Sequence, residues 1–174
     1  MIETAANSMH LYDPAQITLE EHRRTAMHEL GHAVVMVASD PTNVPESISI
    51  NNNAGSYGRV KLAGGQGNQT EQELIELIAA LLGGKNAEMA FFGSHSTGCV
   101  NDYNRAKRIA HNMIDNYAMV SFGDTERAIL QQADRMSWEI ISQYRAAMEK
   151  MVDILLERKE LTGQEFVEIL EKYR

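Results

Sequence analysis

Residues 18–39 read TLEEHRRTAMHELGHAVVMVAS and predict one long helix. The start is marked by Thr18-Leu19-Glu20-Glu21, a capping box in which the hydroxyl and the glutamate each satisfy a backbone N–H at a helix terminus. Pro41 and Pro45 follow the stretch, and proline cannot continue a helix. We therefore expect the helix to begin at the capping box and to end near Ser39.

The middle of this predicted helix contains His28-Glu29-Leu30-Gly31-His32, which matches the pattern H-E-x-x-H. Residues four apart on a helix lie on one face, so both imidazoles can point at one ion. Neutral imidazole is a good ligand for Zn²⁺. Glu29 lies further around the helix, where it can serve as a general base instead of a ligand. The alternative is a pair of partly buried, hydrogen-bonded histidines without a metal, and the helical context favours the metal site.

A catalytic zinc site usually has three protein ligands, and this motif supplies two of them. The extended pattern H-E-x-x-H-x-x-G-x-x-H is not present, because Val35 stands at the glycine position and Ala38 at the last histidine position. A glutamate further along the chain could complete the site, but the residues alone select none. These residues alone therefore do not identify the third ligand.

The rest of the chain predicts a mainly α domain with one small β-hairpin beside the helix that carries the motif. Polar and apolar residues alternate at 47–50 and 57–62, on either side of a stretch rich in Asn and Gly, which is typical of a hairpin. Two further capping boxes begin at Thr70 and Thr162. The additional helices that we expect cover residues 70–92, 101–119, 125–158 and 162–170.

The composition argues against a nucleic-acid-binding, disulfide-stabilised or membrane-spanning protein. The 174 residues include 16 Lys and Arg against 24 Asp and Glu, a net charge of −8, whereas nucleic-acid binding needs clustered basic residues. The single cysteine, Cys99, excludes an intrachain disulfide. No stretch reaches the roughly 20 apolar residues of a membrane-spanning helix, and no signal peptide is recognisable. We expect a flexible leader over residues 1–17 and one cytoplasmic domain over residues 18–174, without nucleic-acid binding or membrane insertion.

Further motifs follow H-E-x-x-H in a defined order. They read Leu82-Gly83-Gly84-Lys85-Asn86-Ala87-Glu88, then Ser96-Thr97-Gly98-Cys99-Val100-Asn101-Asp102, and near the C-terminus LLERKELTGQEF over residues 155–166. Together they resemble the peptidase domain of FtsH-type proteases over about residues 22–171. The resemblance implies that Asp102 is the third Zn²⁺ ligand, beside His28 and His32, and that Glu29 is the catalytic base.

The sequence departs from the FtsH-type pattern in several places. Leu30 replaces a small residue, Met89 stands where a second glutamate is common, and the region after Ile48 lacks the usual Pro-Arg-Gly turn. Full-length members also carry transmembrane helices and an AAA+ ATPase module, but no P-loop is present here, since Gly84-Lys85 is followed by Asn86. We therefore expect an excised peptidase domain or a stand-alone relative.

The function that these features predict is a zinc-dependent endopeptidase acting on extended or unfolded polypeptides. We expect the substrate to pair as an added strand along an edge within residues 46–62. The resemblance implies delivery by an AAA+ ATPase module or partner and a homo-hexameric assembly. Two alternatives stay open: a catalytically silent scaffold or interaction domain, and a stand-alone ATP-independent regulatory peptidase.

A few more residues are candidates for a role at the site. Glu88 is a candidate for a carboxylate that hydrogen-bonds a zinc-bound imidazole, although a structural role in its helix is as reasonable. Cys99 is more simply a small buried residue than a ligand. His111 and Tyr103 follow Asp102 on the same predicted helix, without a signal that assigns them to the site. The remaining histidines are interpreted as surface residues: His10, His22 and His95.

Overall fold

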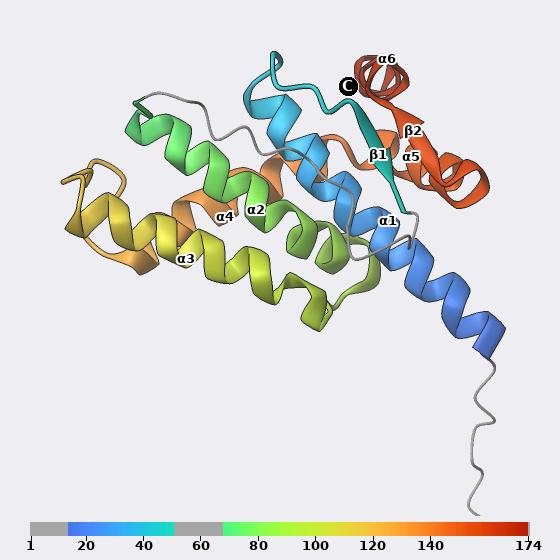
Figure 1. The fold of residues 1–174 in the computed structure, drawn as a ribbon, viewed down its shortest axis with the longest axis horizontal. Coiled ribbons are helices and arrows are strands. Elements are labelled where there is room, and N and C mark those ends of the chain that lie inside the picture. The colour runs from blue at the N-terminus through green and yellow to red at the C-terminus, as the bar shows by residue number, and fades with distance from the viewer. Residues whose placement is uncertain (1–13, 51–67, 174) are drawn as a thin grey trace, which may run out of the picture.

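The computed structural model describes residues 14–50 and 68–173, and this part of the chain is mainly α-helical, as predicted. The elements in chain order are α1 (Pro14–Ser39), β1 (Ser47–Ser49), α2 (Glu71–Phe92), the 3₁₀ turn η1 (Thr97–Cys99), α3 (Val100–Asp115), α4 (Glu126–Gln143), α5 (Arg145–Arg158), β2 (Glu160–Thr162) and α6 (Gly163–Lys172). Figure 1 shows α2 between α1 and α3, with α4 behind α2 and with α5, β2 and α6 beyond α1.

α1 and α2 cross in close contact, and glycine makes this possible. A Cβ atom added to Gly31 would collide with the backbone carbonyl of Gly83, and one added to Gly83 would collide with the carbonyl of Gly31. Small residues let two helix backbones approach more closely than side chains usually allow. The Gly83-Gly84 pair therefore marks close packing, and α2 runs through it without a break.

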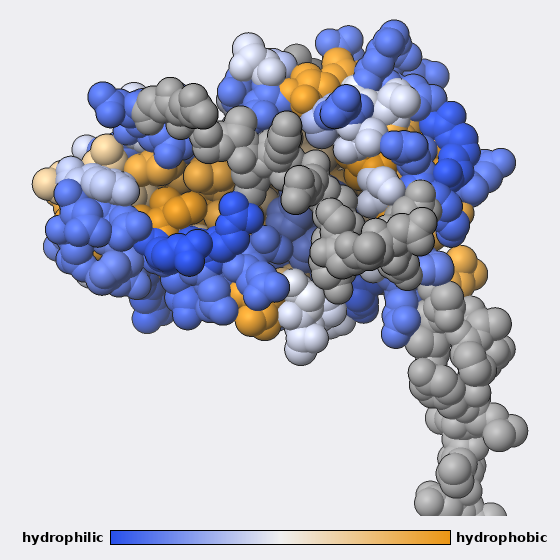
Figure 2. Space-filling view, in the orientation of Figure 1, coloured by the Kyte–Doolittle hydropathy of each residue, from blue (hydrophilic) through white to orange (hydrophobic). Residues whose placement is uncertain are grey.

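Apolar residues from all the helices form one core beneath a hydrophilic surface. The side chains buried most completely include Met27 and Leu30 of α1, Ile78 and Leu81 of α2, and Phe166 of α6. Figure 2 shows that hydrophilic residues cover most of the described surface on the visible face, with apolar residues in separate patches. Across residues 14–50 and 68–173, no helix combines the length and the apolar character needed to span a bilayer.

The small sheet joins two distant parts of the sequence. β1 pairs with β2 in antiparallel register, with Ser47 opposite Thr162 and Ser49 opposite Glu160. We predicted a strand at 47–50 but paired it with residues 57–62, and those residues lie outside the described part of the chain. The observed partner is the three-residue strand just before α6, which is too short to show an alternating pattern of its own.

Several helix boundaries differ from the prediction. α1 begins at Pro14, four residues before the capping box at Thr18, and proline is well suited to a first helical position. α3 ends at Asp115 instead of continuing to residue 119. The single helix predicted over 125–158 is two helices, because Tyr144 between α4 and α5 leaves helical geometry with φ −97° and ψ 16°. The starts at Thr70 and Thr162 are confirmed, each with a complete capping box.

Candidate metal centre

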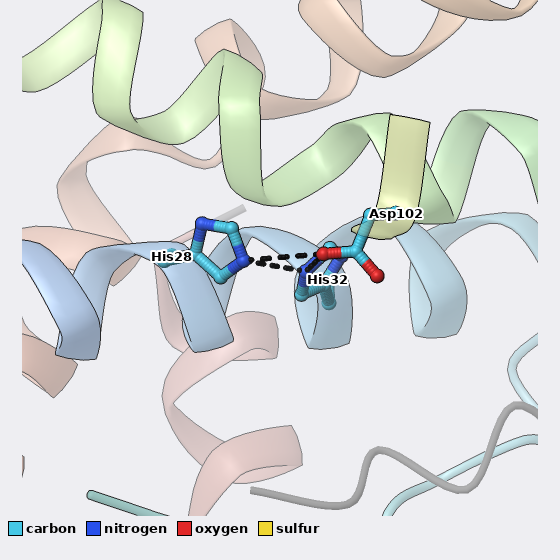
Figure 3. Close-up of side chains that lie close together, drawn as sticks. All are labelled: His28, His32 and Asp102. Atoms are coloured by element: carbon cyan, nitrogen blue, oxygen red, sulfur yellow. Dashed lines mark hydrogen bonds and ion pairs between the residues drawn. The ribbon is translucent and has the colours of Figure 1, made fainter. Parts of the chain in front are cut away.

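Three predicted ligand side chains meet where α1 faces the start of α3. His28 and His32 lie one turn apart on α1, and Asp102 comes from the first turn of α3 (Figure 3). The Nε2 atoms of the two histidines are 3.0 Å apart. The Asp102 Oδ2 atom lies 3.4 Å from His28 Nε2 and 3.3 Å from His32 Nε2. The structure thus brings together residues separated by 70 or more positions in sequence, and their role as ligands stays a prediction.

The hydrogen bonds behind the two rings determine which nitrogens carry protons. His32 Nδ1 lies 2.7 Å from the backbone carbonyl of Ala80, and a carbonyl can only accept. His28 Nδ1 lies 2.8 Å from the Glu88 carboxylate, which also accepts when ionised. Each ring therefore donates from Nδ1, and each neutral ring directs the lone pair of Nε2 toward the other. Together with Asp102, three acceptor atoms converge without a donor, an arrangement that requires a positive charge.

The spacing of these three atoms fits a Zn²⁺ ion. Bonds of about 2.0–2.1 Å in tetrahedral geometry place neighbouring ligand atoms about 3.3–3.4 Å apart. The observed separations are 3.0, 3.3 and 3.4 Å, so little movement is needed to bring all three into bonding distance. Two imidazoles and one carboxylate are also a ligand set typical of catalytic zinc sites, which leave a fourth position for water or substrate.

The charges of the cluster affect its proton affinity. Burial lowers the pKa of His28, but hydrogen bonds to Asp102, Cys99 and Glu88 outweigh burial and raise that pKa to about 11. Burial also opposes ionisation of Asp102, yet contacts with both imidazoles hold the pKa of its carboxyl well below the usual range. Without a metal, the cluster is therefore expected to take up a proton, and a metal ion must displace it.

Glu29 is buried beside this cluster without belonging to the ligand triangle. Glu29 is only 4% exposed. Its carboxyl forms no hydrogen bond with residues 14–50 or 68–173. Burial raises its pKa, the nearby imidazoles of His32 and His28 lower it, and the charge of Asp102 raises it again, with a net upward shift. A carboxylate with a raised pKa close to a metal centre is well suited to accept and release a proton.

Glu88 contacts the ring of His28 on the side away from the three converging acceptor atoms. It is 1% exposed and accepts from His28 Nδ1, Arg24, and both the backbone N–H and the hydroxyl of Ser96. Burial raises its pKa, but the hydrogen bonds from His28, Ser96 and Arg24 lower it to about 2. Carboxylates in such positions orient a ligating imidazole and fix its tautomer.

Cys99 creates a second group of possible ligand atoms, together with His28 and Glu88. Its Sγ lies 3.8 Å from His28 Nδ1 and 3.4 Å from Glu88 Oε1. Glu88 already accepts from several donors, one of them the guanidinium of Arg24, so a cation adds little there. Cys99 faces the back of the His28 ring, away from the triangle of acceptor atoms.

Gly84 provides the space for the His28 ring against α2. A Cβ atom at this position would lie 2.6 Å from Cε1 and 2.7 Å from both ring nitrogens of His28. Contacts below 3.0 Å are not tolerated without a shift of one partner. The glycine therefore lets the imidazole lie between α1 and α2 in reach of both Glu88 and Asp102.

The other residues considered from the sequence lie outside the cluster. His111 is exposed and pairs with Glu126 and Asp115. Tyr103 is 44% exposed on α3, next to Asp102 but without a hydrogen bond to the ligand atoms. His95 is exposed and contacts the Ser96 carbonyl. His10 and most of the predicted 46–62 edge lie outside the described residues.

Two contributions to the site were missed by sequence reasoning. The carbonyl of Ala80 anchors His32, and a backbone acceptor gives no sequence signal. Arg24 contacts Glu88, and its position four residues before His28 on the same helix face was a signal that could have identified it.

The fold and this cluster define a helical domain of the H-E-x-x-H class, in which a carboxylate from a second helix joins two histidines of the first. The profile of a family described as Peptidase family M41 matches residues 15–126, more than half of the sequence. The chain therefore belongs to peptidase family M41.

Similar curated proteins agree with this family. The chain is 29% identical to the ATP-dependent zinc metalloprotease FtsH of Mycoplasmopsis pulmonis, over 90% of this chain and 26% of the relative. It is 29% identical to the protein of the same name from Pseudothermotoga lettingae, over 88% of this chain and 30% of the relative. A third, from Bacillus subtilis, is 35% identical over 59% of this chain and 16% of the relative. The chain thus spans about a quarter to a third of the first two relatives.

Proposed function

We propose that this chain is a zinc-dependent endopeptidase that hydrolyses peptide bonds in extended or unfolded polypeptides. The observation that supports it most strongly is the convergence of His28 Nε2, His32 Nε2 and Asp102 Oδ2, three acceptors at 3.0–3.4 Å from one another. Membership of peptidase family M41 supports peptide hydrolysis, and the names of its relatives include zinc. In this proposal His28, His32 and Asp102 are the metal ligands.

The protein groups divide the chemistry between them. Zn²⁺, when bound, supplies Lewis-acid chemistry that makes a water more acidic and stabilises negative charge on the peptide carbonyl oxygen. Glu29 accepts the proton from the attacking water and then passes it to the departing amine nitrogen. The Glu88 carboxylate and the Ala80 carbonyl hold the two imidazoles in the tautomer that leaves Nε2 free to bind metal.

Substrate binding is proposed along the segment 46–62. β1 at the start of this segment is extended, lies beside α1 and already forms one ladder with β2. Backbone pairing of an added strand is tolerant of side-chain sequence, which is appropriate for unfolded substrates. The proposal therefore predicts weak sequence preference and a requirement for extended conformation.

The wider assembly is proposed from the relatives. Their names specify ATP dependence, and this chain spans only 26% and 30% of the first two. We propose that the domain acts in the cytoplasm as the proteolytic module of a homo-hexamer, with an AAA+ ATPase module or partner that unfolds and delivers the substrate.

The test of the catalytic role is Glu29→Gln compared with wild type. Both proteins are loaded with zinc and assayed on unfolded casein, with zinc content measured in the same samples. We expect Glu29→Gln to lose at least about 10²-fold in kcat/KM, because general acid–base catalysis contributes about 10²–10⁴-fold, and to keep one zinc. Equal cleavage by both proteins would refute the role of Glu29. A wild type that binds zinc without cleaving would support the scaffold alternative.

A further inference from the structure

Arg24 contacts both Glu88, which holds His28, and the chain segment that leads to Asp102. It lies one helical turn before His28 on α1, so the two side chains share a face. Its NH1 atom donates to Glu88 Oε2 at 3.1 Å and to the Ser94 carbonyl at 2.8 Å. Its guanidinium also stacks on Phe92, 4.5 Å from the ring centroid. Three contacts hold the side chain in one place, with 22% of it exposed.

When His28 is neutral, as it would be as a zinc ligand, Glu88 depends on this arginine for charge compensation. The carboxylate is 1% exposed, and a buried carboxylate without a positive partner is strongly unfavourable. Among the described residues, Arg24 is the only Lys or Arg paired with it. Oε2 accepts from Arg24 and the Ser96 N–H, which leaves Oε1 directed at His28 Nδ1 at 2.8 Å. Arg24 therefore fixes the orientation of the Glu88 carboxylate, and that carboxylate in turn fixes the imidazole of His28.

The second contact of Arg24 acts on the chain that leads to Asp102. Ser94 lies in the connection between α2 and α3, and Ser96 in the same connection is hydrogen-bonded to both oxygens of Glu88. That connection continues through η1 into the first turn of α3, where Asp102 lies. One side chain thus restrains the positions of two proposed ligands from different helices.

We propose that Arg24 is a positioning residue of the metal centre, which sets zinc affinity by holding Glu88 against His28 and the Ser94 carbonyl against α1. This inference rests on the proposed function, because it assumes that His28 and Asp102 bind the ion. It adds a residue outside the H-E-x-x-H motif whose loss weakens the site without removing a ligand.

The experiment compares Arg24→Gln with Arg23→Gln. Arg23 is the adjacent arginine. Its side chain is 43% exposed and pairs at 3.4 Å with the exposed Asp153, so its replacement makes the same charge change away from the site. Zinc dissociation constants are measured by competition with a chelating indicator. Visible absorption spectra of the Co²⁺-loaded proteins report the ligand geometry directly.

We expect Arg24→Gln to bind zinc about tenfold more weakly, the lower end of the range for losing an outer partner of a ligating histidine. Its Co²⁺ spectrum should change, and Arg24→Lys should recover part of the affinity, because the ammonium keeps the charge but lacks the planar fork. Arg23→Gln should match wild type in both measurements. A wild-type affinity and spectrum in Arg24→Gln would overturn the inference, even if its thermal stability falls.

Arg24→Lys and His28→Ala separate a failure of the positioning role from a failure to fold or a failure of the proposed metal site. If Arg24→Gln does not fold, the same measurements on Arg24→Lys decide, and wild-type affinity with a wild-type spectrum would overturn the proposal. His28→Ala tests the metal site itself. Loss of zinc in His28→Ala with no change in Arg24→Gln refutes only the positioning role, whereas wild-type zinc binding in His28→Ala refutes the proposed function.

Discussion

At the scale of single residues, the candidate centre is prepared to receive a cation. Both imidazoles are held by acceptors at Nδ1, the Ala80 carbonyl and the Glu88 carboxylate, so that both Nε2 lone pairs face Asp102. Ordering side chains on binding costs conformational entropy, and this cost is reduced when the ligands are already fixed. In the proposed metal centre, the outer contacts are therefore expected to contribute to zinc affinity although they do not touch the ion.

The space at Gly84 provides a test of this fixed geometry. In Gly84→Ala the new methyl group would lie 2.6–2.7 Å from the His28 ring, so the ring must move away from Glu88 and Asp102. We expect zinc affinity to fall about tenfold or more, comparable to the loss of an outer hydrogen bond. Isothermal titration with zinc measures this directly. Unchanged affinity would show that the ring position does not depend on the glycine.

His111 gives a pH dependence that is separate from the metal centre. Its hydrogen bond to Glu126 and the charge of Asp115 raise its pKa above 6.5. The stabilisation is therefore complete below the unfolded pKa and is lost as the pH rises through the folded pKa. Urea unfolding of wild type and His111→Gln should show a larger difference at about pH 5.5 than at about pH 9. A difference that grows with pH would contradict this assignment.

The sequence predicted part of the cluster for a local reason. His28, Glu29 and His32 lie on one helix, and helix periodicity relates their directions. Asp102 is 70 residues further on, so it came only from resemblance to known motifs. Neither route identified Ala80, because every residue has a carbonyl, and the direction of this one depends on how α2 packs against α1.

At the scale of elements, the site depends on how closely α1 approaches α2. Gly31 and Gly83 face each other across the crossing, and each carbonyl occupies the space that a Cβ on the other would need. This close approach places Ala80 beside His32 and Glu88 beside His28. The helix pair therefore sets the geometry of the two proposed histidine ligands, and α3 brings Asp102 to them.

Gly83→Ala tests the close crossing of α1 and α2, because the crossing determines whether the substitution lowers or raises the free energy of unfolding. In an unconstrained helix, replacing glycine with alanine stabilises by about 0.8–1.0 kcal/mol. Here the methyl group collides with the Gly31 backbone, and overpacking of this kind costs about 1–3 kcal/mol or more. We expect a net decrease in the free energy of unfolding of about 1–2 kcal/mol, measured by urea denaturation of the metal-free protein. An increase in stability would contradict the close crossing.

Elements with a local signal were easier to predict than elements defined by tertiary contacts. The capping boxes at Thr70 and Thr162 correctly located two helix starts, whereas the similar pattern at Thr18 lies inside α1. The apolar stripe from α4 to α5 continues across the break at Tyr144, so periodicity could not reveal it. β2 exists because it pairs with β1, which no property of three residues can predict.

At the scale of the whole molecule, a single helical core holds the two helices that carry the proposed ligands, α1 and α3, against α2. The domain belongs to peptidase family M41 and spans about a quarter to a third of the first two relatives described above. The described fold explains how residues far apart in sequence reach one point. Processing of folded substrates is proposed to need the ATP dependence stated in those relatives' names, whereas all three proposed ligands lie within this chain.

Anomalous diffraction at the zinc absorption edge, from crystals of the zinc-loaded protein, tests the central claim most directly. We predict one strong peak within about 2.0–2.2 Å of His28 Nε2, His32 Nε2 and a carboxylate oxygen of Asp102. The same peak should be absent from crystals of the Asp102→Ala protein grown at limiting zinc. A fully occupied zinc ion in wild-type crystals that is not bound to Asp102 would contradict the account.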